Sequence, residues 1–211
     1  MTRILIADDH TIFREGLKRI LSESPDIVVA DEAQNGSEAL RKVLNNDFDL
    51  VLLDISMPGI SGLDVLKQIK NEKPKLPVLI LSVYPEEQYA VRVLRAGAAG
   101  YLTKESALDE LISAIRRIAQ GRKYITSSLA ERLATEVESD TDKPPHETLS
   151  DREYQVLLLI ASGKAVKQIA EDLHLSEKTV STYRSRILEK MRMKTSAELT
   201  HYTIKHHLLD Q

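Results

Sequence analysis

The sequence contains no cysteine and no tryptophan, and aromatic residues occupy only 4% of its 211 positions. The absence of cysteine excludes a disulfide framework, a thiolate metal site and a thiol nucleophile, and it fits a reducing compartment. Long apolar runs are also absent from the start of the chain, because residues 4–7 are followed at once by Asp8-Asp9. Such a run is too short for a signal peptide or a membrane span. We therefore expect a cytoplasmic protein without a membrane partner.

The composition that is present is typical of a globular protein, with 42% hydrophobic and 29% charged residues. The length leaves room for two small domains. Charge is unevenly distributed between them: residues 1–148 carry 19 Lys and Arg against 24 Asp and Glu, whereas residues 149–211 carry 10 against 8. The carboxy-terminal part is therefore the one expected to approach a polyanion.

Five short apolar runs are each followed by a helical pattern. The runs cover residues 4–7, 27–30, 50–53, 78–81 and 100–103. This alternation predicts the α/β class, with a doubly wound sheet of five parallel strands. If that sheet is flavodoxin-like, its strand order is 2-1-3-4-5. Ser37 is the expected cap of the second helix, and a last helix over 107–120 ends this domain at residue 121.

Residues 122–147 are predicted to form a linker that includes one helix over 127–136. The acidic residues Glu136, Glu138, Asp140 and Asp142, followed by Lys143-Pro144-Pro145, indicate an extended, proline-stiffened segment. Residues 148–211 have helical patterns only. Ser150 and Glu153 form a capping box at the start of an apolar run that Gly163 ends, so we expect a small all-α domain.

Polar residues follow four strands of the predicted sheet. They are Asp8 and Asp9, Asp54, Ser82 and Lys104. Because the first and third strands are neighbours, three carboxylates should meet at one edge of the sheet and require a cation. Oxygen donors with neither cysteine nor a nearby histidine ligand suit Mg²⁺. A single acid at a strand end is as well explained by capping of the next helix, but the joint spacing favours a site.

These residues resemble the receiver domain of bacterial response regulators over residues 1–121. The resemblance is carried by Asp8-Asp9, Asp54 with Met57-Pro58-Gly59 and Gly62, Ser82, Tyr101 and Lys104. It implies that Asp54 accepts a phosphoryl group from a sensor histidine kinase. It also implies that Asp8, Asp9, Asp54 and the Ser56 carbonyl hold Mg²⁺, that Ser82 and Lys104 bind phosphoryl oxygens, and that Tyr101 swings inward behind Ser82. No glycine-rich loop follows the first strand, which disfavours a nucleotide site.

The carboxy-terminal domain contains two helical patterns separated by a tight turn at His174-Leu175, which predicts a helix-turn-helix. Ser176 is the expected cap of the longer helix, over residues 177–191. Its polar face carries Lys178, Ser181, Thr182 and Ser185, residue types that suit the major groove of DNA. Residues 176–194 hold six basic and two acidic residues. Solvation of a surface helix explains that charge equally well, and the helix-turn-helix punctuation favours DNA binding.

Residues 149–208 resemble the LuxR-type DNA-binding domain. The matching motifs are Leu149-Ser150-x-Arg152-Glu153, Ile169-Ala170, Leu175-Ser176-x-Lys178-Thr179-Val180 and Lys190-Met191. With the receiver, the chain resembles the NarL/FixJ response regulators. The resemblance implies base contacts from Ser181, Thr182 and Ser185, and backbone contacts from Lys178, Thr179, Arg184, Arg186 and Lys190. It also implies dimerisation through Leu199, Tyr202 and Thr203 of the last helix, although packing within the domain explains each of these three side chains equally well. The expected partners are the kinase, double-stranded promoter DNA and a second copy of the chain, with RNA polymerase as a further candidate.

Two alternatives compete with a phosphorylation-dependent transcription regulator that is not itself an enzyme. A phosphatase using Asp54 as nucleophile would need an acid two residues later, where Ser56 stands. A constitutive DNA-binding regulator would use its receiver only to dimerise, and the complete set of acids, hydroxyl and lysine argues against it. An Asp54→Asn variant separates the constitutive regulator from the phosphorylation-dependent one, because unchanged DNA affinity and regulation would support the constitutive regulator.

Overall fold

The structure is a computed structural model that describes residues 1–138, 144–206 and 208–209. The chain divides into two compact units, residues 1–133 and 134–211. Of the expected linker, Asp140, Asp142 and Lys143 lie outside the described residues. Among the helices that the structure describes, none has the length and apolar character needed to cross a bilayer.

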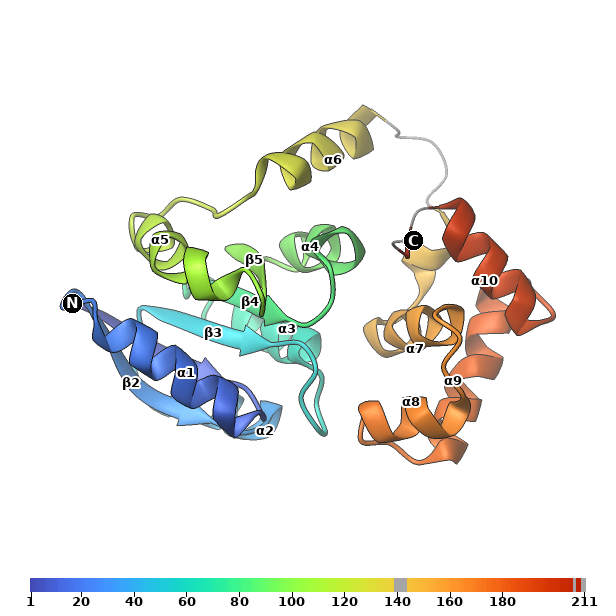
Figure 1. The fold of residues 1–211 in the computed structure, drawn as a ribbon, viewed down its shortest axis with the longest axis horizontal. Coiled ribbons are helices and arrows are strands. Elements are labelled where there is room, and N and C mark those ends of the chain that lie inside the picture. The colour runs from blue at the N-terminus through green and yellow to red at the C-terminus, as the bar shows by residue number, and fades with distance from the viewer. Residues whose placement is uncertain (139–143, 207, 210–211) are drawn as a thin grey trace. The chain divides into compact units, whose positions relative to one another are not determined.

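Strands and helices alternate through the first unit (Figure 1). Its elements are β1 (Thr2–Ala7), α1 (Thr11–Ser22), β2 (Ile27–Ala33), α2 (Gly36–Asn45), β3 (Leu50–Asp54), α3 (Gly62–Glu72), β4 (Val78–Ser82), α4 (Glu86–Arg95), β5 (Gly100–Thr103) and α5 (Ala107–Ala119). Helix α6 (Ser127–Glu138) begins in this unit and ends beyond its last residue. The strand order is β2-β1-β3-β4-β5 with every pair parallel, which confirms the predicted doubly wound sheet.

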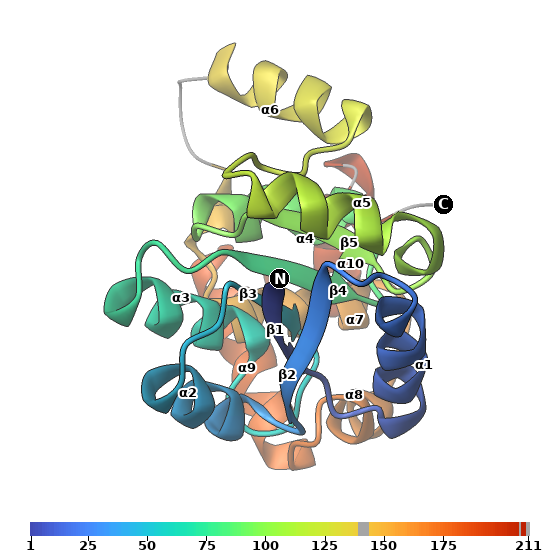
Figure 2. The same ribbon diagram turned by 90° about the vertical axis from the view of Figure 1, so that its left-hand side faces the viewer.

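Helices cover both faces of this sheet: α1 and α5 lie on one face, and α2 and α3 lie on the other (Figure 2). Every residue of β3 and β4 is buried, as expected for central strands that are covered on both sides. One core cluster joins the sheet to α1 and α5 and includes Ile6, Leu17, Leu52 and Leu111. This packing fixes the carboxyl ends of β1 and β3 beside each other.

The edge strand β2 runs to Ala33 and is longer than the predicted residues 27–30. Its polar residues Asp31 and Glu32 pair with Leu5 and Ile6 of β1 after a register shift between Ile4 and Leu5, and cations lie beside both carboxylates. Lys42 Nζ lies 2.7 Å from Asp31 Oδ1, and Lys18 Nζ lies 2.7 Å from Glu32 Oε1. An apolar pattern alone therefore misses this part of the strand.

The cap of α2 is Asn35 rather than the predicted Ser37. The helix begins at Gly36, and the Asn35 side chain accepts a hydrogen bond from the Glu38 backbone N–H at 2.9 Å. Gly36 allows this early start because a Cβ there would lie 2.7 Å from the Ile60 carbonyl oxygen. Asparagine and serine cap helices equally well. The packing around Gly36, and not the type of capping residue, therefore determines where α2 begins.

In the described residues of the second unit, every regular element is a helix. The elements are the short 3₁₀ turn η1 (Pro145–Thr148), α7 (Asp151–Ala161), α8 (Val166–Asp172), α9 (Glu177–Lys190) and α10 (Ser196–Lys205). Helix α7 packs against α9 and α10, and α8 packs against α9. The predicted capping box at Ser150 and Glu153 is present, and the Ser176 side chain caps α9 through the Thr179 N–H. His174, at φ 51°, makes the turn between α8 and α9, so the predicted helix-turn-helix is confirmed.

A Gly62→Ala substitution should destabilise the first unit. The added Cβ would lie 2.0 Å from the Asp54 carbonyl oxygen. Because this oxygen and the Cα that carries the Cβ both belong to the backbone, neither atom can rotate away. We expect the free energy of unfolding to fall by about 1–3 kcal/mol, as in other overpacked sites. Gly16→Ala, inside α1 with nothing within 4 Å of its new Cβ, should instead stabilise by about 0.5–1 kcal/mol. Urea unfolding of both variants tests this, and equal behaviour of the two would contradict it.

Candidate functional site

A cluster of charged side chains lies at the carboxyl edge of the sheet. Parallel pairing of Ala7 with Leu53 sets the following residues, Asp8 and Asp54, beside each other, and each is only 1% exposed. Lys104, at the end of β5, reaches both: its Nζ lies 2.7 Å from Asp8 Oδ2 and 2.8 Å from Asp54 Oδ2. The Lys104 backbone N–H donates to the Ser82 carbonyl at 2.7 Å, which fixes the base of this side chain.

The electrostatics of the cluster are dominated by buried charge. Burial raises the pKa of Asp54, and Asp8 raises it further, whereas the Lys104 ammonium opposes both effects. Burial lowers the pKa of Lys104, but the Asp54 and Asp8 carboxylates outweigh it and leave that pKa above its ordinary value. The Phe13 ring adds a cation-π contact, with its centroid 4.7 Å from Lys104 Nζ. Three carboxylates against one ammonium leave an excess of negative charge that a divalent cation would offset.

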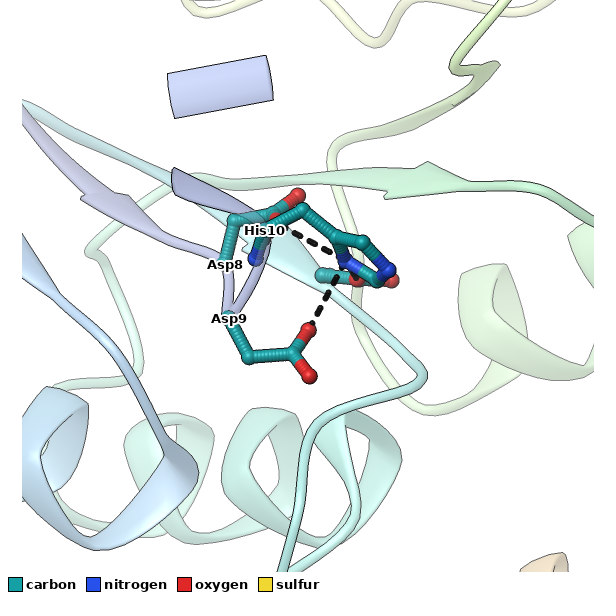
Figure 3. A group of neighbouring side chains, drawn as sticks. Asp8, Asp9 and His10 are labelled. Atoms are coloured by element: carbon teal, nitrogen blue, oxygen red, sulfur yellow. Dashed lines mark hydrogen bonds and ion pairs between the residues drawn. The ribbon is translucent and has the colours of Figure 1, made fainter. Parts of the chain in front are cut away.

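His10 belongs to the same cluster, and the expectation that no histidine lies near the carboxylates was wrong. Its Nδ1 lies 3.0 Å from Asp9 Oδ1, 3.2 Å from Asp8 Oδ1 and 3.9 Å from Asp54 Oδ2 (Figure 3). The ring points inward because the His10 backbone N–H donates to Asp8 Oδ1 at 2.7 Å, which turns the chain just before α1 begins. The sequence feature that could have placed His10 near the carboxylates is its position directly after Asp9.

The donor set fits a hard divalent ion. One donor atom from each of Asp8, Asp9, His10 and Asp54 can be chosen so that all four lie within 4.8 Å of one another. Carboxylate oxygens are the ligands that Mg²⁺ prefers. Ser56, the other expected ligand, begins the loop after β3, where its N–H donates to Asp54 Oδ1 at 3.0 Å. That bond holds the Asp54 carboxylate in one orientation.

Ser82 and Tyr101 lie on the neighbouring strands, beyond Asp54. The Ser82 side chain is fully buried, and its Oγ accepts a hydrogen bond from the Tyr84 N–H at 3.1 Å. Tyr101 is 1% exposed and its hydroxyl donates to the Tyr84 carbonyl at 2.7 Å. Burial raises the pKa of this phenol well above its usual range. Tyr101 was expected to swing inward on activation, and in this structure its side chain is buried, in the inward position.

The chain that leaves α5 returns to the start of β5 and then to the start of α4. The Tyr124 N–H donates to the Ala99 carbonyl at 2.8 Å, which places this segment alongside β5. The Thr126 hydroxyl then donates to the Glu86 carboxylate at 2.7 Å and accepts from the Leu129 N–H at 3.2 Å. Thr126 therefore ties the start of α6 to the start of α4, a connection that no sequence motif indicated.

In the helical unit, six of the residues expected to contact DNA are exposed on α9. They are Lys178, Ser181, Thr182, Ser185, Arg186 and Lys190. The Thr182 and Ser185 hydroxyls donate to backbone carbonyls one turn earlier, at 2.9 and 3.1 Å. Their oxygens still have lone pairs that can accept a hydrogen bond from a base. The polar face predicted for this helix is therefore present at the surface.

Three of the expected DNA contacts, Lys190, Arg184 and Thr179, have side-chain partners inside the domain. Lys190 Nζ lies 2.6 Å from Oε2 of Glu153, a carboxylate that is 4% exposed. Arg184 Nε donates to Ser196 Oγ at 2.8 Å, and the Thr179 hydroxyl lies 2.8 Å from Ser176 Oγ in the cap of α9. Each of these side chains contributes to the packing or capping of the helices as well as to the charge of the surface.

Helix α10 presents a different face from the one expected. Leu199 and Thr203 were expected to mediate dimerisation, but both are 0% exposed, because α10 packs against α7. Tyr202 is half-buried, with its hydroxyl 2.8 Å from His146 Nδ1. The large apolar residue that α10 leaves at the surface is Ile204, which is 46% exposed.

Comparison with known protein families and sequences gives consistent matches along the chain. The family model described as the response regulator receiver domain matches residues 4–116, and the model of bacterial regulatory proteins of the luxR family matches residues 147–203. Response regulator UvrY of Escherichia coli (strain K12) is 40% identical over 209 residues, covering 99% of this chain and 96% of that protein. Response regulator GacA of Pseudomonas protegens is 37% identical over 210 residues, covering 100% and 99%.

Solved structures give the same result. The RcsB response regulator of Salmonella typhimurium, studied for its conformational dynamism in DNA interaction, matches with a TM-score of 0.59 and 26% identity, covering 97% of this chain and 98% of that one. A complex of the two-component response regulator RcsB with DNA also matches with a TM-score of 0.59 and 26% identity, covering 99% of both chains. The chain therefore belongs to the NarL/FixJ family of response regulators, with a receiver domain followed by a LuxR-type DNA-binding domain.

Proposed function

We propose that this protein is a cytoplasmic transcription regulator whose DNA binding is controlled by phosphorylation of Asp54 by a sensor histidine kinase. The observation that carries the proposal is the position of Asp54, buried at the end of β3 with Lys104 Nζ 2.8 Å from its Oδ2. Phosphoryl transfer needs an aligned nucleophile and neutralisation of the charge that spreads over the phosphoryl oxygens. This site offers a carboxylate nucleophile and a fixed cation.

Each residue of the site has a role in this reaction. A carboxylate oxygen of Asp54 attacks the phosphorus of a phosphohistidine, the P–N bond breaks and an acyl phosphate forms, and the histidine nitrogen leaves with the electron pair. Asp8, Asp9, Asp54 and the Ser56 carbonyl would hold Mg²⁺, which supplies neutralising charge when bound. The Ser56 N–H orients Asp54, and Lys104 and Ser82 are placed to bind the phosphoryl oxygens.

The output is binding to promoter DNA by α9. Ser181, Thr182 and Ser185 would contact base edges, and the exposed Lys178 and Arg186 would contact phosphates. Arg184, Thr179 and Lys190 would contribute to DNA binding less by direct contact than by holding the helices in position and adding to the charge of the surface. We expect a homodimer on paired half-sites, with the surface of α10 around Ile204 as its contact, and RNA polymerase as a further partner.

Hydrogen bonds link the phosphorylation site to the start of α6. Ser82 and Tyr101 hold the backbone of Tyr84, and Pro85 leads into α4. Glu86, the first residue of α4, accepts from Thr126, which caps α6. A change at Ser82 that moves Tyr84 would therefore move the attachment of α6.

The first prediction concerns the acceptor itself. Incubation with Mg²⁺ and a small-molecule phosphodonor should add one phosphoryl group to the wild type, seen as a mass shift of the intact protein, and none to Asp54→Asn. The substitution keeps the size of the side chain and removes the nucleophilic charge. A receiver of known competence serves as a positive control for the donor. Unchanged DNA affinity and regulation in Asp54→Asn would instead support the constitutive regulator.

A second prediction separates base contacts from phosphate contacts on α9. Thr182→Ala should lower the preference for the specific site over random DNA, whereas Arg186→Ala should weaken binding to both and reduce the salt slope by about 1. Binding isotherms at several salt concentrations measure both effects. Lys190→Ala is less informative because it leaves the nearly buried Glu153 carboxylate without its ammonium partner. Equal losses on both DNAs for both variants would refute the assignment.

A third prediction concerns the connection through Thr126. Thr126→Val removes the hydrogen bond to Glu86. In the wild type, phosphorylation should change DNA affinity by about 5- to 150-fold, the usual range of such couplings. In Thr126→Val this change should be several-fold smaller. Thr126→Ser keeps the hydroxyl and should behave as the wild type. Both variants should acquire the phosphoryl group normally by mass. A Thr126→Val protein that retains the full phosphorylation effect would exclude this route.

A further inference from the structure

Helices α4, α5, α7, α8 and α9 end in the same backbone arrangement. In each, the first residue after the C-cap has a positive φ and its N–H donates to the carbonyl three residues earlier, while the next N–H donates to the carbonyl five residues earlier. This Schellman motif satisfies carbonyls that the last turn leaves unpaired. Helices α4, α5 and α7 place glycine at the position with positive φ, as Gly97, Gly121 and Gly163. Glycine adopts this left-handed conformation without steric cost.

The two helices of the helix-turn-helix have no glycine at this position. It is occupied by His174 after α8, at φ 51°, and by Arg192 after α9, at φ 55°. The Arg192 N–H donates to the Glu189 carbonyl at 3.1 Å, so α9 ends in the same motif. Histidine is among the residues enriched in the left-handed conformation, whereas arginine is not. A glycine in place of Arg192 would therefore end α9 with less strain.

The strain at Arg192 is not offset within the helical domain. A left-handed residue with a side chain lowers the ratio of folded to unfolded protein by a factor of roughly 5 to 30. The attraction between an exposed cation and the carbonyl end of a helix returns about fivefold at most. Arg192 is exposed, and among the described residues none forms an ion pair with it. Contacts inside the domain therefore do not account for arginine at this position.

The place of Arg192 along α9 bears on its role. Arg192 follows Ser185 by seven residues, which is nearly two full turns, so it continues the polar stripe that Ser181 and Ser185 begin. Helix α9 has 14 residues and is therefore about 21 Å long, whereas the major groove of DNA is about 12 Å wide. When the first turns of such a helix contact bases, its last turn extends past the groove to the phosphates at its edge.

We propose that Arg192 contacts a DNA phosphate beyond the end of α9, and that arginine stands in this strained position because a glycine would remove the contact. Backbone strain is concentrated at functional sites for this reason. A guanidinium suits the role, because it can bond two phosphate oxygens at once. The exposed Lys194, two residues later, adds positive charge next to it.

This inference rests on the DNA binding by α9 in the proposed function, but not on phosphorylation of Asp54. Lys178, in the first turn of α9, serves as the reference contact. Weaker DNA binding by Lys178→Ala together with unchanged binding by Arg192→Gly would overturn this inference and leave the proposed interface in place. Unchanged binding by both variants, or a wild type that binds no duplex with or without a phosphodonor, would overturn both.

The first measurement is the affinity of the full chain for a DNA duplex of random sequence at several salt concentrations, with and without a small-molecule phosphodonor. Arg192→Gly and Arg192→Ala should both bind several-fold more weakly, and the salt slope should fall by about 1 per protomer. Arg192→Lys keeps the charge and should retain most of the affinity. The matched control is Lys75→Ala, which removes an exposed cation of the receiver and should change neither quantity.

The second measurement is hydrogen exchange of the α9 amides, which follows the stability of the helical unit. Arg192→Gly should slow this exchange several-fold, because it relieves the strain. Arg192→Ala keeps a side chain in the left-handed conformation and should exchange no more slowly than the wild type. The expected result is a glycine variant that is more stable and binds DNA less well. Exchange in Arg192→Gly as fast as in the wild type, or faster, would overturn the proposal, since arginine would then hold no strain at this position.

Discussion

The ammonium of Lys104 between the carboxylates of Asp8 and Asp54 is the interaction on which the receiver site depends. A buried carboxylate loses its hydration, and two of them side by side also repel each other. Both are nevertheless held at 1% exposure, because Lys104 bonds to each of them within 2.8 Å. Removing one partner of such a set leaves buried charge uncompensated, which is more costly than never having formed the pair. The edge of the sheet is thus prepared for additional positive charge.

The same constraint explains which parts of the site could be predicted from the sequence. Short apolar strands alternating with helices indicated a parallel sheet, and the flavodoxin-like strand order, which the structure has, places Asp8, Asp54 and Lys104 at one edge. The direction of the His10 ring was not predictable in this way, because a loop hydrogen bond to Asp8 decides it. The Glu86 and Thr126 pair is separated by 40 residues and belongs to no repeating pattern. Local periodicity carries no information on contacts of this kind.

The helical domain shows the same limit in another form. A helical pattern identifies an apolar stripe, but not whether the stripe covers its own domain or meets a second molecule. On α9 the two faces were assigned correctly, because Val180 and Ile187 are buried and the opposite residues are polar. On α10 the stripe of Leu199 and Thr203 turned out to be core, and a residue outside it, Ile204, is the exposed apolar one. The packing of α7 against α10 shows that this stripe covers its own domain.

The position of Tyr101 bears on how a receiver of this kind could be switched. The phenol is buried and bonded to the Tyr84 carbonyl, so a switch at Tyr101 would connect this inward arrangement with one in which the phenol is exposed. A phosphoryl group can then act only by shifting populations, and its effect is limited to its differential contacts in the two states. In this structure those contacts would come from Ser82 and Lys104, since both are anchored to the strands around Tyr101. The free energy available for switching therefore equals the difference, between the two states, in the interaction of Ser82 and Lys104 with a phosphoryl group.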